Sequence, residues 1–133
     1  MSARQPSKLE MAILSLLWEH RSMKAREVLE QLPDRKERAY TSVLSVLQAM
    51  ERKNLVGHTR EGKTNVYHAV VKQEKTVGRV LRDLVRDVFG GSPRVAVQHL
   101  LHETNLSEEE LQAMEDLLAE YRIKRQSKKG SAR

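Results

Sequence analysis

Apolar residues recur at helical spacing along most of the chain, and the pattern changes to alternation only once. The spacing predicts helices over residues 7–20, 22–32 and 38–54, each with one apolar face. Residues 55–71 are instead rich in β-forming residues on both sides of Gly62, which predicts two strands joined by a tight turn. The predicted order is therefore helix, helix, helix, hairpin.

Helix-boundary residues support this division. Ser7 with Glu10 predicts a capping box at the first helix, Ser22 is expected to cap the second, and Pro33 ends it. After the hairpin, the same criteria predict helices over 75–89 and 95–102, separated by glycines. A last helix is expected to begin with a second capping box, formed by Ser107 and Glu110, and to run to about residue 121.

The helix over residues 38–54 has an unusual polar face. Its apolar stripe consists of Val43, Val46, Leu47 and Met50. The opposite face carries Thr41, Leu44, Ser45 and Gln48, where a solvated face more often carries Glu and Lys. Hydroxyl and amide groups can contact phosphates and base edges, and a leucine can contact a thymine methyl group. An ordinary amphipathic helix is the alternative when this helix is considered alone.

The hairpin that follows has the features of a wing. Arg60 and Lys63 lie near its turn, where they could contact phosphates or the minor groove. A surface hairpin with solvated charges is the alternative, but its place after three helices favours the wing. The predicted fold class is mainly α with a small β-hairpin wing, an N-terminal winged helix-turn-helix followed by a helical C-terminal domain.

The composition of the chain indicates which kind of partner it binds. The 133 residues carry a net charge of +6, with a pI near 9.8, which indicates an anionic partner. No apolar run predicts a signal peptide or a membrane span, so double-stranded DNA is favoured over direct membrane binding. The chain has no cysteine, which excludes disulfides and thiolate-bound metals and fits a cytoplasmic location.

An enzyme is not expected, and no cofactor is predicted. The sequence has no phosphate-binding glycine loop, nucleophile elbow or zinc-protease motif. His99 and His102 have a spacing that can bind a metal on a helix, but no further histidine and no convincingly placed carboxylate lies beside them in the sequence. Helix-surface or interface histidines are the preferred interpretation, and no metal site is predicted.

The C-terminal helices carry more aliphatic surface than three short helices can bury alone, which predicts a homodimer. The alternative is that these helices fold back on their own N-terminal domain. The residues expected in the dimer interface, or in the core that supports it, are Leu81, Leu84, Val85, Val88, Leu100, Leu101, Leu111, Met114, Leu117 and Leu118.

Several segments together resemble the penicillinase-repressor family of winged-helix regulators (BlaI, MecI and CopY). They are LEMAILSLLWEH, VLEQL, AYTSVLSVLQAMERKNLV, REGKTNVYHAVV and NLSEEELQAMEDLL. Trp18 matches the family tryptophan, Thr41 begins a match to its T-T-V motif, and Gly62 with Tyr67 matches its wing motif. Asn54 stands where the family often has glycine. The resemblance covers residues 7–121.

The resemblance implies a transcriptional repressor that binds a palindromic operator as a homodimer. It also implies relief of repression, either by a ligand or by cleavage in the dimerisation domain under a membrane sensor protease system. The cleaved Asn–Phe bond of the β-lactam-responsive members would map to His99–Leu100, so this sequence departs from that motif. The C-terminal cysteine motif of the copper-responsive members is absent.

These observations predict a winged-helix DNA-binding domain over residues 1–72, a helical dimerisation domain over 73–122 and a basic, disordered tail over 123–133. A winged helix that binds protein instead of specific DNA is the competing interpretation. The residues predicted to contact DNA are Tyr40, Thr41, Ser42, Leu44, Ser45, Gln48, Arg52, Lys53, Arg60 and Lys63.

Overall fold

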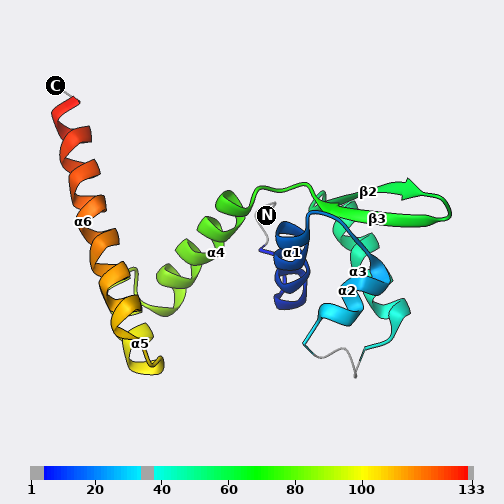
Figure 1. The fold of residues 1–133 in the computed structure, drawn as a ribbon, viewed down its shortest axis with the longest axis horizontal. Helices are drawn as coiled ribbons and strands as arrows, with labels where there is room; N and C mark the ends of the chain where they lie inside the picture. Colours follow the sequence, from blue (N-terminus) through cyan, green and yellow to red (C-terminus); the bar gives the residue numbers. More distant parts are fainter. Residues whose placement is uncertain (1–4, 34–37, 132–133) are drawn as a thin grey trace. The chain divides into compact units, whose positions relative to one another are not determined.

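The computed structural model of the chain describes residues 5–33 and 38–131 (Figure 1). The chain divides into two compact units, one ending at Leu84 and the other beginning at Val85. The polar turn predicted after Pro33 falls largely on residues 34–37, outside the described residues. The elements are α1 (Lys8–His20), β1 (Met23–Lys24), α2 (Ala25–Gln31), α3 (Tyr40–Arg52), β2 (Val56–Glu61), β3 (Thr64–Ala69), α4 (Gln73–Val88), α5 (Pro93–Glu103) and α6 (Glu108–Ser131).

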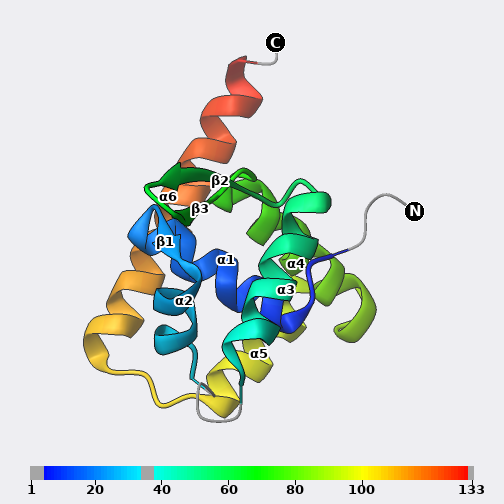
Figure 2. The same ribbon diagram turned by 90° about the vertical axis from the view of Figure 1, so that its right-hand side faces the viewer.

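The first unit is a winged helix-turn-helix, which confirms the predicted fold class. Figures 1 and 2 show α1, α2 and α3 gathered beside a small sheet whose strand order is β1-β3-β2. β2 and β3 pair antiparallel from Val56↔Ala69 to Glu61↔Thr64, and they form the wing. The turn between them begins at Gly62, whose φ of 64° is a conformation that glycine adopts at little steric cost.

The prediction for residues 22–24 was wrong. Ser22 does not cap a helix, because Met23 and Lys24 form a strand that pairs antiparallel with Tyr67 and Val66 of β3. The helix begins afterwards at Ala25, and Glu27 accepts a hydrogen bond from the Lys24 backbone N–H at 2.7 Å. A two-residue strand has no local periodicity, and its pairing with a distant strand cannot be read from neighbouring residues.

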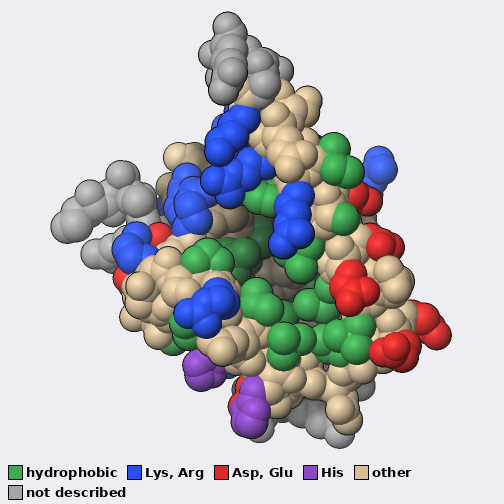
Figure 3. All heavy atoms as spheres, turned by 90° about the vertical axis from the view of Figure 1, so that its left-hand side faces the viewer, with side chains coloured by type: hydrophobic (Ala, Val, Ile, Leu, Met, Phe, Trp, Pro, Cys, Tyr) green, Lys and Arg blue, Asp and Glu red, His purple; other side chains and the backbone are tan. Residues whose placement is uncertain are grey.

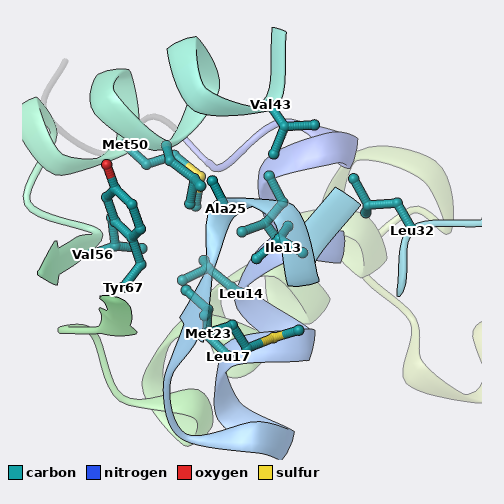
Figure 4. Close-up of a cluster of buried hydrophobic side chains, with 12 residues drawn as sticks. Ile13, Leu14, Leu17, Met23, Ala25, Leu32, Val43, Met50, Val56 and Tyr67 are labelled. Atoms are coloured by element: carbon teal, nitrogen blue, oxygen red, sulfur yellow. The ribbon is translucent and has the colours of Figure 1, made fainter. Parts of the chain in front are cut away.

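A single apolar cluster holds the first unit together. Figure 4 shows side chains from the three helices and the sheet converging on one centre, among them Ile13, Leu17, Val43 and Tyr67. These four side chains are at most 1% exposed. The Trp18 indole N–H donates to the Val71 carbonyl at 3.1 Å, which ties the end of the sheet to α1. The predicted capping box at Ser7 is also present.

The end of α3 is set by Asn54. The Leu55 N–H donates to the Met50 carbonyl at 2.9 Å and the Asn54 N–H donates to the Glu51 carbonyl at 3.0 Å, which is the hydrogen-bond pattern of a Schellman motif. Asn54 takes a φ of 64°, and asparagine is the non-glycine residue best suited to this left-handed conformation. The position where the family often has glycine therefore keeps the conformation that favours glycine.

The second unit differs from the first because none of its described side chains is buried. Figure 3 shows one face of the molecule with hydrophobic side chains at its surface. A disordered tail was predicted from residue 123 onward, but α6 continues to Ser131. The prediction was therefore wrong for residues 123–131. Arg, Lys and Gln are good helix formers, and cations suit the C-terminal end of the helix dipole.

The predicted domain boundary after residue 72 falls just before α4, whereas the two compact units divide within α4.

Candidate nucleic-acid interface

Helix α3 presents the predicted polar face to solvent. Val43, Leu47 and Met50 are buried against the core, and this leaves Thr41, Ser42, Ser45 and Gln48 exposed, with Leu44 half-buried between the two faces. No side chain caps the N-terminus of α3, because Ala39 occupies the N-cap position. Backbone amides in the first turn of such a helix favour an anion.

A groove of about 390 Å³ runs between α3 and one face of the wing. Its lining brings together five of the predicted residues from two distant segments, namely Tyr40, Leu44 and Gln48 of α3 with Arg60 and Lys63 of the wing. Thr64, Asn65 and Tyr67 of β3 and Ala25 of α2 line it as well. Amide, hydroxyl and apolar groups thus lie beside cations in one concave surface, which we call the basic groove.

Two further cations, which were not predicted from the sequence, also line the basic groove. Lys24 of β1 and Arg26 of α2 bring the number of lining cations to four, and no acidic side chain appears among the described lining residues. The Arg26 guanidinium carbon lies 4.9 Å from the centre of the Tyr40 ring, a cation–π contact between α2 and α3. Basic residues at the start of the second predicted helix were the available signal, but only the folded chain brings them beside the wing.

Arg52 and Lys53 do not line the basic groove. Both are exposed at the end of α3, and the Lys53 ammonium lies 2.8 Å from the Glu10 carboxylate of α1. Burial would raise the pKa of the Glu10 carboxyl, but hydrogen bonds from Lys53 and from the Ser7 backbone N–H outweigh burial and hold that pKa below its ordinary value. Contact of Arg52 and Lys53 with DNA stays a prediction.

The wing is also tied to the last turn of α3. The His58 ring nitrogen Nδ1 lies 2.8 and 2.9 Å from the two carboxylate oxygens of Glu51. The same imidazole packs at 5.6 Å, centroid to centroid, on the ring of Tyr67. These contacts join one strand of the wing to the last turn of α3, and Tyr67 also lines the basic groove.

Most of the predicted interface residues of the C-terminal helices lie at the surface. Leu81, Leu84, Val88, Leu100 and Leu101 are all at least 44% exposed, and Leu117 and Leu118 are about two-thirds exposed. Val85 and Met114 are half-buried, and Leu111 is exposed. His99 and Leu100 lie within α5, where the His99 ring packs 5.3 Å from that of Phe89.

The described part of the chain has neither a metal-ligand cluster nor a membrane-spanning helix. No three His, Asp or Glu side chains within residues 5–33 and 38–131 lie together as metal ligands would. No described helix combines the length and the apolarity needed to cross a bilayer.

A helix-turn-helix followed by a wing, with a basic groove between recognition helix and wing, is the architecture of winged-helix DNA-binding proteins. The sequence profile of the penicillinase repressor family matches residues 6–120. The transcriptional regulator BlaI of Mycobacterium tuberculosis (strain CDC 1551 / Oshkosh) is 32% identical over 114 residues, which cover 84% of this chain and 81% of that protein. The penicillinase repressor of Bacillus licheniformis is 21% identical over 118 residues, covering 89% and 92% of the two chains. The chain therefore belongs to the penicillinase repressor family, whose members are transcriptional repressors and not enzymes.

Among solved structures, the solution structure of the DNA-binding domain of the repressor BlaI matches with a TM-score of 0.46 at 22% identity. It covers 53% of this chain and 88% of that one.

Proposed function

We propose that the protein represses transcription by binding a duplex DNA operator in its basic groove. The observation that carries this proposal is the lining of the groove, where four cations from two separate segments lie with Leu44 and Gln48 of α3 and no acidic residue is among the described lining. Phosphate contacts supply most of the affinity of such an interface, and base-edge contacts supply its specificity.

The positions of the side chains favour a division of roles. Thr41, Ser42 and the first-turn amides of α3 would bind phosphates, because they lie at an uncapped helix N-terminus. Leu44, Ser45 and Gln48 follow one another along the exposed side of α3 and would reach base edges in the major groove.

The experiment compares variants of equal charge in the full-length chain. Replacing Arg60 and Lys63 by Ala should weaken binding to an operator isolated from mixed genomic fragments and lower the salt dependence by about 0.9 for each lost phosphate contact. Replacing Lys75 and Arg79 of α4 also removes one Lys and one Arg, from exposed positions outside the basic groove. Equal losses in both variants would contradict the groove as the binding site, and no DNA binding at all would favour a protein-interaction module.

The repressor is proposed to act as a homodimer. A compact unit without one buried described side chain has no core of its own, and a second molecule would cover the apolar surface that it leaves exposed. A second copy is the simplest partner, because the exposed apolar residues would face their own equivalents across a two-fold axis.

The charge distribution of α6 fits such a partner. The described helix carries six acidic residues from Glu108 to Glu120 and no basic residue there, and then five basic and no acidic residues from Arg122 to Lys129. In an antiparallel pair of α6 helices, the acidic start of one helix can lie beside the basic residues that follow Tyr121 in the other copy. A register that places Leu111 opposite Tyr121 and Met114 opposite Leu118 pairs apolar positions and also brings Glu108 opposite Lys124 and Glu110 opposite Arg122.

Two equally exposed aliphatic side chains on α6 can show whether a new charge disrupts the dimer only when it lies in the proposed interface. Leu118 and Ile123 are both 66% exposed, but Ile123 lies off the apolar stripe that contains Leu118. Leu118→Asp should convert the dimer into monomer in analytical ultracentrifugation, because a charge would be buried unpaired. Ile123→Asp should leave the dimer intact. A monomeric unaltered chain at micromolar concentration would contradict the proposal.

A two-fold dimer predicts a palindromic operator whose half-sites lie about one helical turn apart or a multiple of it. Linking two half-site contacts can raise the affinity by roughly 10²–10⁴, so separating the copies is enough to end repression. Cleavage at His99–Leu100 would separate them, although this bond lies inside α5 and would need local unfolding before a protease could bind it. A ligand between the two copies is the alternative route. We place the protein in the cytoplasm, where it would meet its operator and any membrane sensor system that signals to it.

A further inference from the structure

Two of the four cations that line the basic groove lie outside the wing, in the strand and the helix that precede α3. Lys24 lies in β1 and Arg26 lies in the first turn of α2. We propose that Arg26 and Lys24 bind backbone phosphates of the operator and that Tyr40 is a positioning residue, which holds the Arg26 guanidinium in place. This inference rests on the proposed function and assigns further residues to the same site.

The contact between Arg26 and Tyr40 carries the inference. The guanidinium carbon lies 4.9 Å from the centre of the tyrosine ring, within the distance of a cation–π interaction. Arg26 is otherwise an exposed side chain, and a free arginine loses rotamer freedom when it binds. Because the ring face already restricts the guanidinium, less entropy is lost when a phosphate is bound.

The location of both cations favours phosphate over bases. When a recognition helix lies in the major groove, the preceding helix crosses the DNA backbone, and Arg26 belongs to that preceding helix. Lys24 is fixed by the pairing of β1 with Val66 of β3, which continues across the sheet to Thr59 in β2. Lys24 therefore belongs to one edge strand of the sheet and Arg60 to the other, and both line the same groove as the base-reading residues Leu44 and Gln48 of α3.

The nearest acidic group from the same segment does not oppose this assignment. The Glu27 carboxylate accepts a hydrogen bond from the Lys24 backbone N–H and does not appear in the lining of the groove. The lining instead supplies Thr64 and Asn65 of β3, which are neutral hydrogen-bonding residues beside the cations.

A double-mutant cycle in the full-length repressor tests the role of Tyr40. Arg26→Ala should weaken operator binding about tenfold, as expected for a lost charged hydrogen bond, and lower the salt dependence by about 0.9 per half-site. Tyr40→Ala should weaken binding roughly twofold to fivefold when Arg26 is present and no further in the Arg26→Ala background. Tyr40→Phe retains the ring face and should bind like the unaltered chain.

Controls make each outcome decisive. Arg79→Ala removes an exposed arginine of α4 outside the groove and should leave the affinity unchanged, and circular dichroism should show that every variant is folded. If Tyr40→Phe lost as much affinity as Tyr40→Ala, the hydroxyl group itself would contact DNA and the positioning role would be wrong. If Tyr40→Ala fails to fold, the proposal can still be tested, because Arg26→Ala and Tyr40→Phe each have their own expected result.

The failure of this inference differs from the failure of the proposed function. The inference would be overturned if Arg26→Ala and Lys24→Ala bound the operator with unaltered affinity while the variant lacking Arg60 and Lys63 bound it more weakly. The proposed operator binding would then still stand. Absence of specific binding by the unaltered chain would overturn the proposed function and this inference with it.

Discussion

The Lys53 ammonium at the end of α3 lies 2.8 Å from the carboxylate of Glu10, a side chain in the first turn of α1 that is only 6% exposed. The second oxygen of the same carboxylate accepts the Ser7 backbone N–H at 2.9 Å. The capping box of α1 and the residue that follows the recognition helix, Lys53, are therefore joined through one buried carboxylate. This pair gives Lys53 a structural role in addition to the DNA contact predicted for it.

Removal of Lys53 should destabilise the winged-helix unit. Lys53→Ala leaves the buried Glu10 carboxylate without one of its hydrogen bonds, so the free energy of unfolding should fall by about 1–3 kcal/mol. Arg52→Ala removes the neighbouring exposed cation and should change it by less than about 0.5 kcal/mol. Urea unfolding of both variants measures the difference, and equal effects would show that the pair contributes nothing.

The same carboxylate should make stability depend on pH. The pKa of Glu10 is lower in the folded chain than its ordinary value, so the unfolded chain takes up the proton first. The stabilising contribution is therefore present above the unfolded pKa, about 4.3, and is lost as pH falls through the folded pKa. Urea midpoints between about pH 6 and pH 3 should decline less steeply in Glu10→Gln than in the unaltered chain. Parallel curves would be the contrary result.

Asn54 should be replaceable by glycine but not by a β-branched residue. With a φ of 64°, Asn54→Gly should be neutral or stabilising by up to about 1 kcal/mol, whereas Asn54→Val should cost about 1–2 kcal/mol. Thermal unfolding measures both changes. A valine variant as stable as the glycine variant would mean that α3 does not end in this way in solution.

Gln48 should affect specificity more than overall affinity. The side chain lines the basic groove and is exposed, and an amide that binds adenine through two hydrogen bonds contributes about 1–3 kcal/mol at one base pair. Gln48→Ala should therefore relax the preference at a single operator position, with its salt dependence unchanged. Binding to a set of operators substituted one base at a time shows whether one position or none responds.

Reversing charges on α6 should weaken the dimer, and a second reversal should restore it. Changing Glu108 and Glu110 to Lys places cations opposite Arg122 and Lys124 in the proposed antiparallel register, and like charges at such distances repel. Adding Arg122→Glu and Lys124→Glu to the same chain should recover the affinity between copies, measured by sedimentation. Failure of the fourfold variant to recover would exclude this register while the Leu118→Asp comparison still tests the dimer.

Local patterns were sufficient for the larger elements of the first unit. The stripe containing Val43 and Leu47 predicted α3 because burial on one side of a helix imposes a spacing of three or four residues. β1 was missed for the opposite reason, since its pairing with β3 joins residues far apart in sequence and leaves no local repeat. The extension of α6 beyond residue 121 was also missed, because charged residues favour a solvated helix and a disordered tail alike.

The candidate site could be predicted only in part. Tyr40, Leu44, Gln48, Arg60 and Lys63 were chosen from helix periodicity and from the position of the turn, and the structure brings these five together. Lys24 and Arg26 join them only through folding, and so does the Glu10 carboxylate that binds Lys53. Contacts of this kind depend on how the helices pack, which one segment's sequence does not encode.

Because no described side chain of the second unit is buried, the proposed dimer has a consequence for the amount of repressor a cell must make. With the homodimer proposed above, the species that occupies both half-sites grows with the square of the monomer concentration when monomer predominates. A twofold fall in synthesis then lowers that species about fourfold, so repression ends over a narrower range of protein level than a monomeric regulator would allow. In such a dimer, the exposed apolar residues of α5 and α6 would make the switch sensitive to gene dosage and to the rate at which the chain is degraded.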